Sequence, residues 1–327
     1  MNTIPMIRRA CLCLALIALT VEASSTLAQN YPSKPIRIII GFAPGGGADI
    51  NARLLAPKLT EILGQPVLIE NRQGAGANIA HELVAKAAPD GYTLLLTTPS
   101  VTTSMALYKK LAFDTLRDLT AVSMFSTGPL VLVVHDAVPA KNLQELIDLA
   151  RSGPGVLTFG SAGTGTGQHL GGEIFKLRTK TDILHVPYKG TGPALTAVLA
   201  GEVNMSFTTI QAASPHIKGG RLRALGSAGA KRSELMPDVP TMSEAGVHGV
   251  VTEIWYGVLA PAATPREIVN LLSHAIIKTA NMPEIRQRIL EQGAEPVGNT
   301  AEAFGKILRD EVSQWIEVVR ASGIQVE

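Results

Sequence analysis

Residues 36–49 read IRIIIGFAPGGGAD and place an apolar, β-branched run directly before a glycine-rich turn. The run Ile36–Gly41 is typical of a buried parallel strand. The next segment, Ile50–Leu63, has the spacing of an amphipathic helix, and Gly64 ends it. A strand, a glycine turn and a helix in this order predict one unit of an α/β fold whose turn approaches a ligand closely.

Residues 156–169 repeat this layout about 120 residues later as VLTFGSAGTGTGQH, followed by the amphipathic segment Leu170–Leu177. The first turn of a helix has N–H groups without intrahelical partners and carries partial positive charge, so it attracts anions. Two such turns predict two lobes that hold one small anion between them. Because the turns share a layout but little identity, we interpret them as lobes of similar design rather than a recent duplication.

Strand-like and helical patterns alternate along the rest of the chain, which is typical of α/β architecture with mainly parallel sheets flanked by helices. Further strands are expected at Val67–Glu70, Tyr92–Thr97, Leu130–His135, Val156–Gly160, Ile183–Val186, Val203–Phe207 and Leu222–Ser227. Helices are expected at Asn51–Leu63, His81–Ala88, Leu143–Arg151, Ala194–Ala200, Gln211–Lys218, Pro265–Thr279, Pro283–Gln292 and Thr300–Ala321. The last three helices are expected to complete the first lobe.

The order of these elements predicts two crossings between the lobes. The chain is expected to cross near Val122–Gly128 and to return near Leu225–Ala230. Lobe I then comprises residues 29–125 plus 228–327, and lobe II comprises residues 126–227.

Residues 1–28 have the pattern of a secretory signal peptide. Arg8 and Arg9 precede an apolar run, Cys11–Val21, that is shorter than the roughly 20 residues of a membrane span. Thr26-Leu27-Ala28 is a small-residue cleavage site, so the mature chain is expected to begin at Gln29 in the periplasm. An uncleaved anchor is the alternative. A lipid anchor is not expected, because no small-small-Cys motif follows the apolar run.

Composition excludes several classes of function. Both cysteines, Cys11 and Cys13, lie in the signal segment, so the mature chain has no thiol for a disulfide, a nucleophile or a metal. The chain has 29 basic and 27 acidic residues without the clustering of a nucleic-acid-binding surface. The remaining length of roughly 300 residues is ample for one or two hydrophobic cores.

Motifs of common catalytic and cofactor sites do not occur. Neither glycine turn supplies the lysine of an NTPase phosphate loop or the GxGxxG spacing of a dinucleotide site. Ser161 does not lie in a GxSxG elbow. The pair His81-Glu82 lacks a second zinc ligand because Ala85 occupies its position, and the seven histidines are scattered. The sequence therefore predicts no catalytic residue, no metal site and no cofactor.

The candidate ligand-binding residues lie in the two turns and after two further strands, because ligands of open α/β sheets gather at the carboxyl ends of strands. Those in the first turn are Phe42, Ala43, Gly45, Gly46, Gly47, Ala48 and Asp49. Those in the second turn are Ser161, Ala162, Gly163, Thr164, Gly165, Thr166 and His169. Those after other strands are Thr98, Ser100, Thr208 and Thr209.

Some of these residues also have a purely structural explanation. Asp49 either bonds the free N–H groups at its helix start, or orders the turn and contacts a ligand amine or water. The hydroxyls of Ser161, Thr164 and Thr166 are ordinary capping groups, yet a helix with spare donors can cap itself and still hold a carboxylate.

The aromatic and imidazole candidates divide between core and pocket. Phe42 either packs in the core or walls the pocket, and His169 either packs or faces the ligand. For Trp255 and Tyr256 we interpret core packing as the better explanation.

Short motifs follow one another in order from about Tyr31 to the C-terminus. They are YPSKPIR (31–37), PGGGAD (44–49), NRQGAGAN (71–78), APDGYT (88–93), GSAGTGT (160–166), HVPYKG (185–190), KRSELMPDVPT (231–241) and WYG (255–257). Together they resemble the periplasmic receptors of the tripartite tricarboxylate transporter family, called TctC-like or Bug receptors.

The resemblance implies a two-lobe, type II-like Venus-flytrap fold that closes on a small carboxylated solute. It implies that the receptor delivers this solute to a membrane complex with two integral subunits. Family members hold the carboxylate with one loop from each lobe, assisted by bound water. By position these loops are Phe42–Asp49 and Ser161–His169. The ligand classes left open are tricarboxylates, dicarboxylates, amino acids and aromatic acids.

We therefore expect a monomeric solute-binding receptor rather than an enzyme. Two alternatives stay open from the sequence. One is a sensor subunit that shares the fold and the site but reports to a signalling partner. The other is a periplasmic hydrolase that uses Ser161 or His169.

Overall fold

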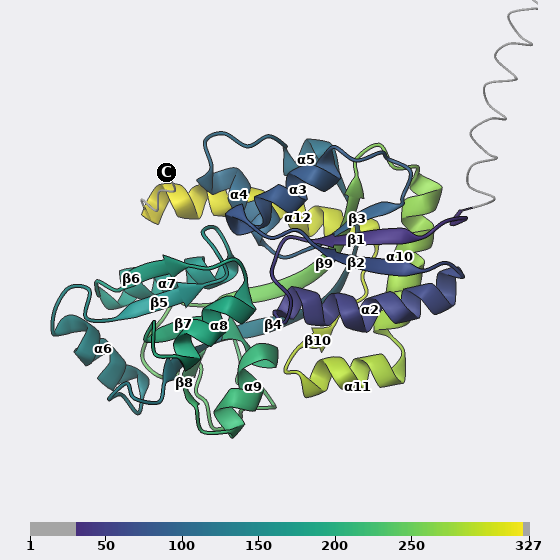
Figure 1. Ribbon diagram of the computed structural model, residues 1–327. Coiled ribbons are helices and arrows are strands. Elements are labelled where there is room, and N and C mark those ends of the chain that lie inside the picture. Colours follow the sequence, from purple (N-terminus) through teal and green to yellow (C-terminus); the bar gives the residue numbers. More distant parts are fainter. Residues whose placement is uncertain (1–30, 323–327) are drawn as a thin grey trace, which may run out of the picture.

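Strand β4, Leu119–His135, joins the two halves of the molecule in the computed structural model, which describes residues 31–322 (Figure 1). The first part of β4 pairs with β9 (Glu253–Pro261) and β10 (Glu295–Pro296). Its last part pairs with β7 (Met205–Thr209) and β8 (Leu222–Ser227). The predicted signal peptide, residues 1–28, lies outside the described residues.

The strands form one hydrogen-bonded path in the order β2-β1-β3-β9-β4-β7-β5-β6. The other strands are β1 (Ile36–Ile40), β2 (Val67–Asn71), β3 (Thr93–Thr97), β5 (Thr158–Ser161) and β6 (Leu184–Pro187). Strands β2, β1 and β3 are parallel in the first half, and β5 is parallel to β6 and β7 in the second.

The prediction of mainly parallel sheets needs a correction, because each half has a mixed sheet. Every pair that includes β4 is antiparallel, and so is the pair of β3 with β9. The reason is connectivity: β4 carries the chain out of the first half, and β9 returns beside it in the opposite direction. Gly128-Pro129 interrupts the strand pattern of β4, so its first part was not expected from the sequence.

Helices cover both sheets, and each expected helix is present, with ends that match the expected ones or lie within four residues of them. They are α2 (Gly47–Leu63), α3 (Asn78–Ala85), α4 (Ser100–Leu107), α5 (Thr115–Asp118), α6 (Leu143–Arg151), α7 (Gly167–Thr179), α8 (Thr191–Leu199), α9 (Ile210–Lys218), α10 (Arg266–Ala280), α11 (Pro283–Glu291) and α12 (Ala301–Ser322), with the 3₁₀ helix η1 (Ala75–Ala77). Helices α4 and α5 were not expected. In Figure 1, helices α6 to α9 belong to the half that contains β5 to β8, and the C-terminal helices return to the other half.

Strand β1 shows why the first half folds as a layered structure. Ile38 and Ile40 lie in a core with Leu55 of α2, while Ile39 faces a second core with Val84 of α3 and Val101 of α4. All six side chains are fully buried. Because both faces of the strand are covered by helices, the strand is apolar at every one of these positions rather than at alternate ones.

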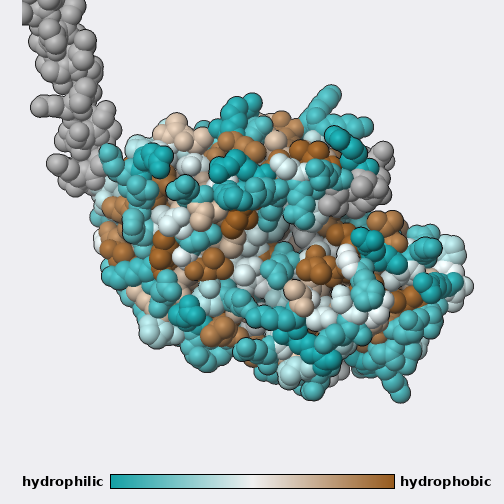
Figure 2. Space-filling view, turned by 180° about the vertical axis from the view of Figure 1, so that it is seen from behind, coloured by the Kyte–Doolittle hydropathy of each residue, from teal (hydrophilic) through white to brown (hydrophobic). Residues whose placement is uncertain are grey.

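The outer surface is largely hydrophilic. Figure 2 shows polar residues over most of the viewed face, with apolar residues in small separate groups. Among residues 31–322, none of the helices combines the length and apolar character needed to cross a membrane.

Candidate functional site

Five strand-to-helix turns meet at the junction of the two halves. The turns β1–α2 and β3–α4 come from the first half, and β5–α7, β6–α8 and β7–α9 come from the second. All five lie at the carboxyl ends of their preceding strands, where α/β sheets bind ligands. A narrow cavity lies between them. It is lined by Phe42, Gly46, Ala48, Thr98, Ala162, Thr166, Gln168, Thr191, Ile254 and Tyr256.

The lining is polar in places but carries no charged side chain. An anion in this cavity would therefore be held by backbone N–H groups, hydroxyls and an amide rather than by an arginine. A ligand ammonium would find no carboxylate there. Within residues 31–322, no group of three His, Cys, Asp or Glu side chains could hold a metal ion.

The first glycine turn is held in shape by Asp49. One carboxylate oxygen of Asp49 accepts a hydrogen bond from the Gly45 amide at 3.1 Å and one from Arg53 Nε at 2.8 Å. The other oxygen accepts from Arg53 at 3.1 Å and from Asn71 at 3.2 Å. Burial alone would raise the pKa of Asp49, but the hydrogen bonds from Arg53, Gly45 and Asn71 lower it. The sequence left two roles open for Asp49, capping of the helix start and ordering of the turn. The hydrogen bonds of its carboxylate correspond to ordering of the turn.

This arrangement leaves donors free at the start of α2. The N–H groups of Gly46, Gly47 and Ala48 make no hydrogen bond within the described chain. Gly46 and Ala48 line the cavity. Unpaired N–H groups at a helix N-terminus together with the helix dipole form a site for a carboxylate.

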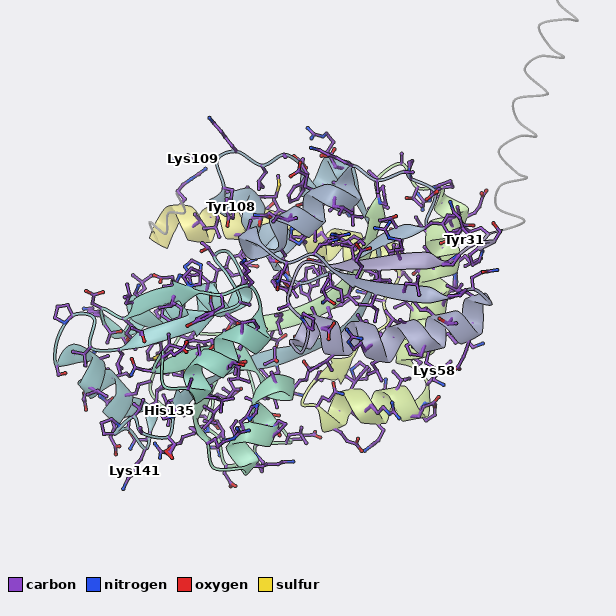
Figure 3. All side chains as sticks on the ribbon, in the orientation of Figure 1. Tyr31, Lys58, Tyr108, Lys109, His135 and Lys141 are labelled. Carbon is purple, nitrogen blue, oxygen red and sulfur yellow. The ribbon has the colours of Figure 1, made fainter. Side chains whose placement is uncertain are left out.

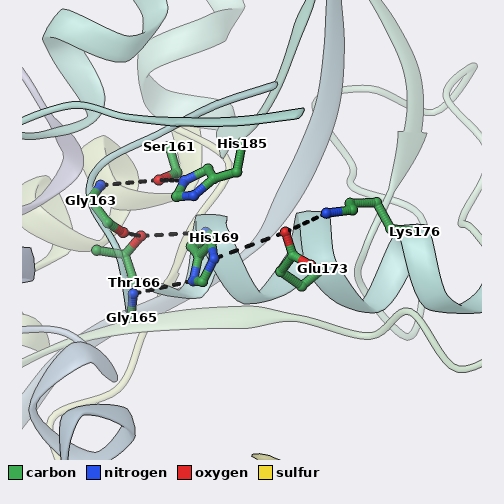
Figure 4. A network of polar contacts seen from close by, with 8 residues as sticks. All are labelled: Ser161, Gly163, Gly165, Thr166, His169, Glu173, Lys176 and His185. Atoms are coloured by element: carbon green, nitrogen blue, oxygen red, sulfur yellow. Dashed lines mark hydrogen bonds and ion pairs between the residues drawn. The ribbon is translucent and has the colours of Figure 1, made fainter. Parts of the chain in front are cut away.

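The second turn has more internal partners, shown in Figure 4. Ser161 Oγ accepts from the Gly163 amide at 3.1 Å and lies 2.7 Å from His185 Nε2. The Gly165 amide donates to His169 Nδ1 at 3.2 Å. Thr166 caps α7 and donates to the Gly163 carbonyl at 2.7 Å.

A second set of free donors remains at the start of α7. The N–H groups of Thr164, Gly167 and Gln168 make no hydrogen bond among residues 31–322. Gln168 also links the turn to α8, because its side chain accepts from the Ala162 amide at 2.8 Å and donates to Thr191 Oγ1 at 2.8 Å. The start of α7 can therefore bind a second carboxylate or share the first.

Each turn also contacts the opposite half of the molecule. The Ala43 amide donates to the Lys189 carbonyl at 3.0 Å. The Thr103 hydroxyl of α4 donates to the Gly165 carbonyl. Tyr108, which follows α4 as Figure 3 shows, donates to the Thr164 carbonyl at 3.4 Å. These contacts describe a closed cleft.

The predicted site residues fall into two groups in the structure. Those that line the cavity are Phe42, Gly46, Ala48, Thr98, Ala162 and Thr166. Those that do not line it are Ala43, Gly45, Gly47, Asp49, Ser100, Ser161, Gly163, Thr164, Gly165, His169, Thr208 and Thr209. Ser100 is fully buried and accepts from Thr98 at 3.1 Å, while Thr209 caps α9. Thr208 Oγ1 is buried without a hydrogen-bond partner in the described residues.

Tyr256 is the main residue that sequence reasoning placed elsewhere. The sequence favoured core packing, and the side chain is indeed 1% exposed, yet it also lines the cavity. Its hydroxyl is adjacent to Gly47, since a Cβ atom there would overlap it. Burial raises the pKa of Tyr256, and nearby Thr209 tempers that rise. Even so, the Tyr256 hydroxyl and Gln211 Nε2 have no hydrogen-bond partner within the described part of the chain.

Four other residues near the cavity were not predicted as ligand-binding. Gln168, Thr191 and Ile254 line it, and the Gln211 side chain lies beside Gly47. Gln168 and Thr191 each follow a glycine at a helix start, and this sequence pattern could have identified them as candidate site residues. Ile254 comes from β9, whose sequence shows no site pattern.

The contact between Ser161 and His185 has the distance of a nucleophile–base pair, which bears on the hydrolase alternative. Ser161 is fully buried, and its oxygen already accepts from the Gly163 amide. Burial, followed by the proximity of the His169 ring and the Lys176 ammonium, lowers the pKa of His185 to about 3, which makes it a poor base. Within residues 31–322, no carboxylate orients the His185 ring. The geometry therefore gives no support to catalysis.

The profile described as "Tripartite tricarboxylate transporter family receptor" matches residues 51–324. The chain belongs to this TctC receptor family. The TctC receptor is 38% identical to Protein BugT of Bordetella pertussis over 313 residues, which cover 95% of this chain and 96% of BugT. The family consists of periplasmic binding proteins, not enzymes, which confirms the predicted class.

Two solved structures are also similar to this TctC receptor. Rpa4515 of R. palustris, determined with adipate, is 34% identical with a TM-score of 0.87, covering 90% of this chain and 99% of that one. MatC (Rpa3494) of Rhodopseudomonas palustris, determined with bound malate, is 33% identical with a TM-score of 0.85, covering 88% and 100%. The chain is also similar to the structure of periplasmic binding protein BugD, 30% identical with a TM-score of 0.88, covering 91% of this chain and 100% of that one, which confirms the predicted fold.

Proposed function

We propose that this TctC receptor binds a short dicarboxylate between its two halves and delivers it to the integral-membrane subunits of a tripartite transporter. The observation that carries the proposal is an uncharged cavity with free N–H groups of α2 on one side and of α7 on the other. Helix N-termini bind carboxylates without an arginine. The structures of two relatives that contain adipate and malate support a dicarboxylate over the other ligand classes.

The lining also argues against amino acids as ligands. An ammonium group buried in this cavity would lack a counter-charge, which is costly. Asp49 is engaged by Arg53 and does not line the cavity.

Each end of the ligand has a distinct set of donors in this proposal. One carboxylate accepts from the N–H groups of Gly46, Gly47 and Ala48, together with the unpartnered Tyr256 hydroxyl and Gln211 Nε2. The other accepts from the free N–H groups of Thr164, Gly167 and Gln168 at the start of α7. These donors replace the water that the carboxylates lose on burial.

Binding would couple to closure of two lobes. Lobe I comprises residues 29–125 plus 228–327, and lobe II comprises residues 126–227. The ligand favours the closed form because only closure brings both donor sets to it. The receptor works as a monomer in the periplasm after removal of residues 1–28.

The proposal is tested by thermal-shift measurements on the chain from Gln29 onward. Malate, succinate, glutarate and adipate are compared with their monoamides and with aspartate. We expect the melting temperature (Tm) to rise with the logarithm of the concentration of one or a few dicarboxylates. The matching monoamides should give little shift. A shift with aspartate alone, or with no acid even after unfolding and refolding to remove co-purified ligand, would contradict the proposal.

Transport is separated from sensing in a deletion strain. Loss of uptake of the identified acid supports the transport role. Normal uptake with lost gene induction would assign the protein to signalling instead.

A further inference from the structure

Two histidines that do not line the cavity, the buried His169 and the half-buried His185, lie against the second glycine turn (Figure 4). His169 is 5% exposed, and its ring centre lies 4.2 Å from that of His185. The His185 ring also stacks on Phe159 of β5 at 4.7 Å. Each ring directs one nitrogen at the turn. His169 Nδ1 contacts the Gly165 amide directly, and His185 Nε2 contacts Ser161 Oγ, which accepts from the Gly163 amide.

The hydrogen bonds define where the protons are. A backbone N–H can only donate, so His169 Nδ1 must be an unprotonated acceptor for Gly165. Ser161 Oγ accepts from the Gly163 amide, and among the described residues its only other close partner is His185 Nε2. Ser161 is fully buried, and its hydroxyl proton needs an acceptor. His185 Nε2 is the only one in reach among the described residues, so the Ser161 hydroxyl donates to it. Both rings are neutral, with opposite tautomers: Nε2–H for His169 and Nδ1–H for His185.

We infer that His169 and His185 are positioning residues that anchor two amides of the second turn, and so select which amides of that turn face the ligand. The amides of Gly163 and Gly165 are drawn toward the histidines. Those of Thr164, Gly167 and Gln168 are left free. Only the expected effect on ligand affinity rests on the proposed function. The hydrogen bonds themselves do not, because every residue that makes them belongs to β5, β6, α7 or the β5–α7 turn.

The surroundings keep both rings neutral. On α7, Glu173 lies 4.0 Å from His169 Nε2 and pairs with Lys176 at 2.9 Å. Strand β5 presents Phe159 and Ser161 to the rings, and neither side chain is charged. Burial and then Lys176 lower the pKa of His169 to about 4. Protonation of His169 Nδ1 would place an N–H group opposite the Gly165 N–H group, so the hydrogen bond that holds the Gly165 amide would be lost.

The first test is ¹⁵N NMR of the imidazole rings in the wild-type chain without ligand. We expect the Nε2–H tautomer for His169 and the Nδ1–H tautomer for His185, both unchanged between pH 8 and pH 5. Either ring in the reverse tautomer, or charged in that range, would overturn the inference. This measurement needs no ligand, so its result stands even if the proposed function fails.

The second test measures the dissociation constant (Kd) for whichever of malate or adipate binds the wild type more tightly. His169→Leu and His185→Leu should each raise the Kd roughly tenfold, as for one misdirected donor. His169→Asn and His185→Gln place an oxygen where Nδ1 and Nε2 were, so they should restore most of the affinity. His248→Leu, at an exposed histidine, is the control and should have no effect.

Ser161→Ala provides a cross-check, because Ser161 acts in series with His185. The double variant Ser161→Ala/His185→Leu should lose no more affinity than either single variant. Equal losses for the leucine and the amide variants would mean that the rings only fill space, and would overturn the inference. If neither acid binds the wild type, the proposed function fails and the NMR result alone decides this inference.

Discussion

Gly76 lies so close to the carbonyl oxygen of Thr164 that a Cβ atom on Gly76 would overlap it. The two residues belong to opposite halves of the molecule, since Gly76 is in η1 and Thr164 is in the β5–α7 turn. Gly76 also has a φ of 62°, in the left-handed region that favours glycine. The closed cleft therefore depends on the missing side chain at this position.

Gly76→Ala should weaken dicarboxylate binding at least about tenfold, because the methyl group blocks the approach of the two halves. The control is Gly220→Ala, which has a φ of 70° and open space around it. Both variants should lose about 1 kcal/mol of unfolding free energy from backbone strain. Kd by calorimetry separates them, and equal affinity in the two variants would contradict the role of this contact in closure.

Tyr256→Phe should lower affinity roughly tenfold while leaving the Tm unchanged or slightly higher. The hydroxyl has no partner in the described chain, so its removal costs the fold nothing and relieves an unpaired buried group. Tyr31→Phe is the matched control, because its hydroxyl donates to the Gly91 carbonyl at 2.7 Å far from the cavity. That variant should lose stability and keep its affinity. The reverse pattern would remove Tyr256 from the proposed site.

Asp49→Asn should destabilise the chain at neutral pH and less so in acid. The pKa of Asp49 is lowered in the folded state, so its stabilisation is present above the unfolded pKa of about 4 and is lost as the pH falls through the folded value. The Tm difference from wild type should therefore shrink between pH 7 and pH 3. Asp310→Asn breaks the exposed pair with Lys306 at the same i,i+4 spacing and should change the Tm little at any pH.

Glu311→Gln should be at least as stable as the wild type at pH 8. Burial raises the pKa of Glu311, although hydrogen bonds from Trp255 at 2.6 Å and Thr102 at 2.8 Å oppose the rise. A raised carboxyl pKa means that ionisation costs stability, so the advantage of glutamine should grow as the pH rises and vanish in acid.

The matched variant for this site is Glu311→Ala. It leaves Trp255 Nε1 without its acceptor and should cost about 1–3 kcal/mol of unfolding free energy. Both variants are compared by urea unfolding from pH 4 to pH 8. A glutamine variant that is as unstable as the alanine variant at every pH would show that Glu311 acts as a charge and not as an acceptor.

Local patterns predicted the regular elements well where packing is simple. Strand β1 is apolar at nearly every position because helices cover both its faces, and α6 (Leu143–Arg151) and β8 (Leu222–Ser227) have the predicted ends. The patterns did not predict the first part of β4, because Gly128-Pro129 is typical of a turn. The strand continues through these residues because it is hydrogen-bonded to β9 on one side of them and to β7 on the other.

The sequence by itself determined the two glycine turns, because the free N–H groups of a helix start follow from backbone chemistry at adjacent residues. It also determined the family, through motifs spread along nearly the whole chain. The tertiary structure alone decided that Tyr256 reaches the start of α2 and that His185 lies against the second turn. Such contacts join residues far apart in sequence and arise from the order of strands in the sheets. Their side chains have the same local pattern as ordinary core residues, so only the folded chain distinguishes them.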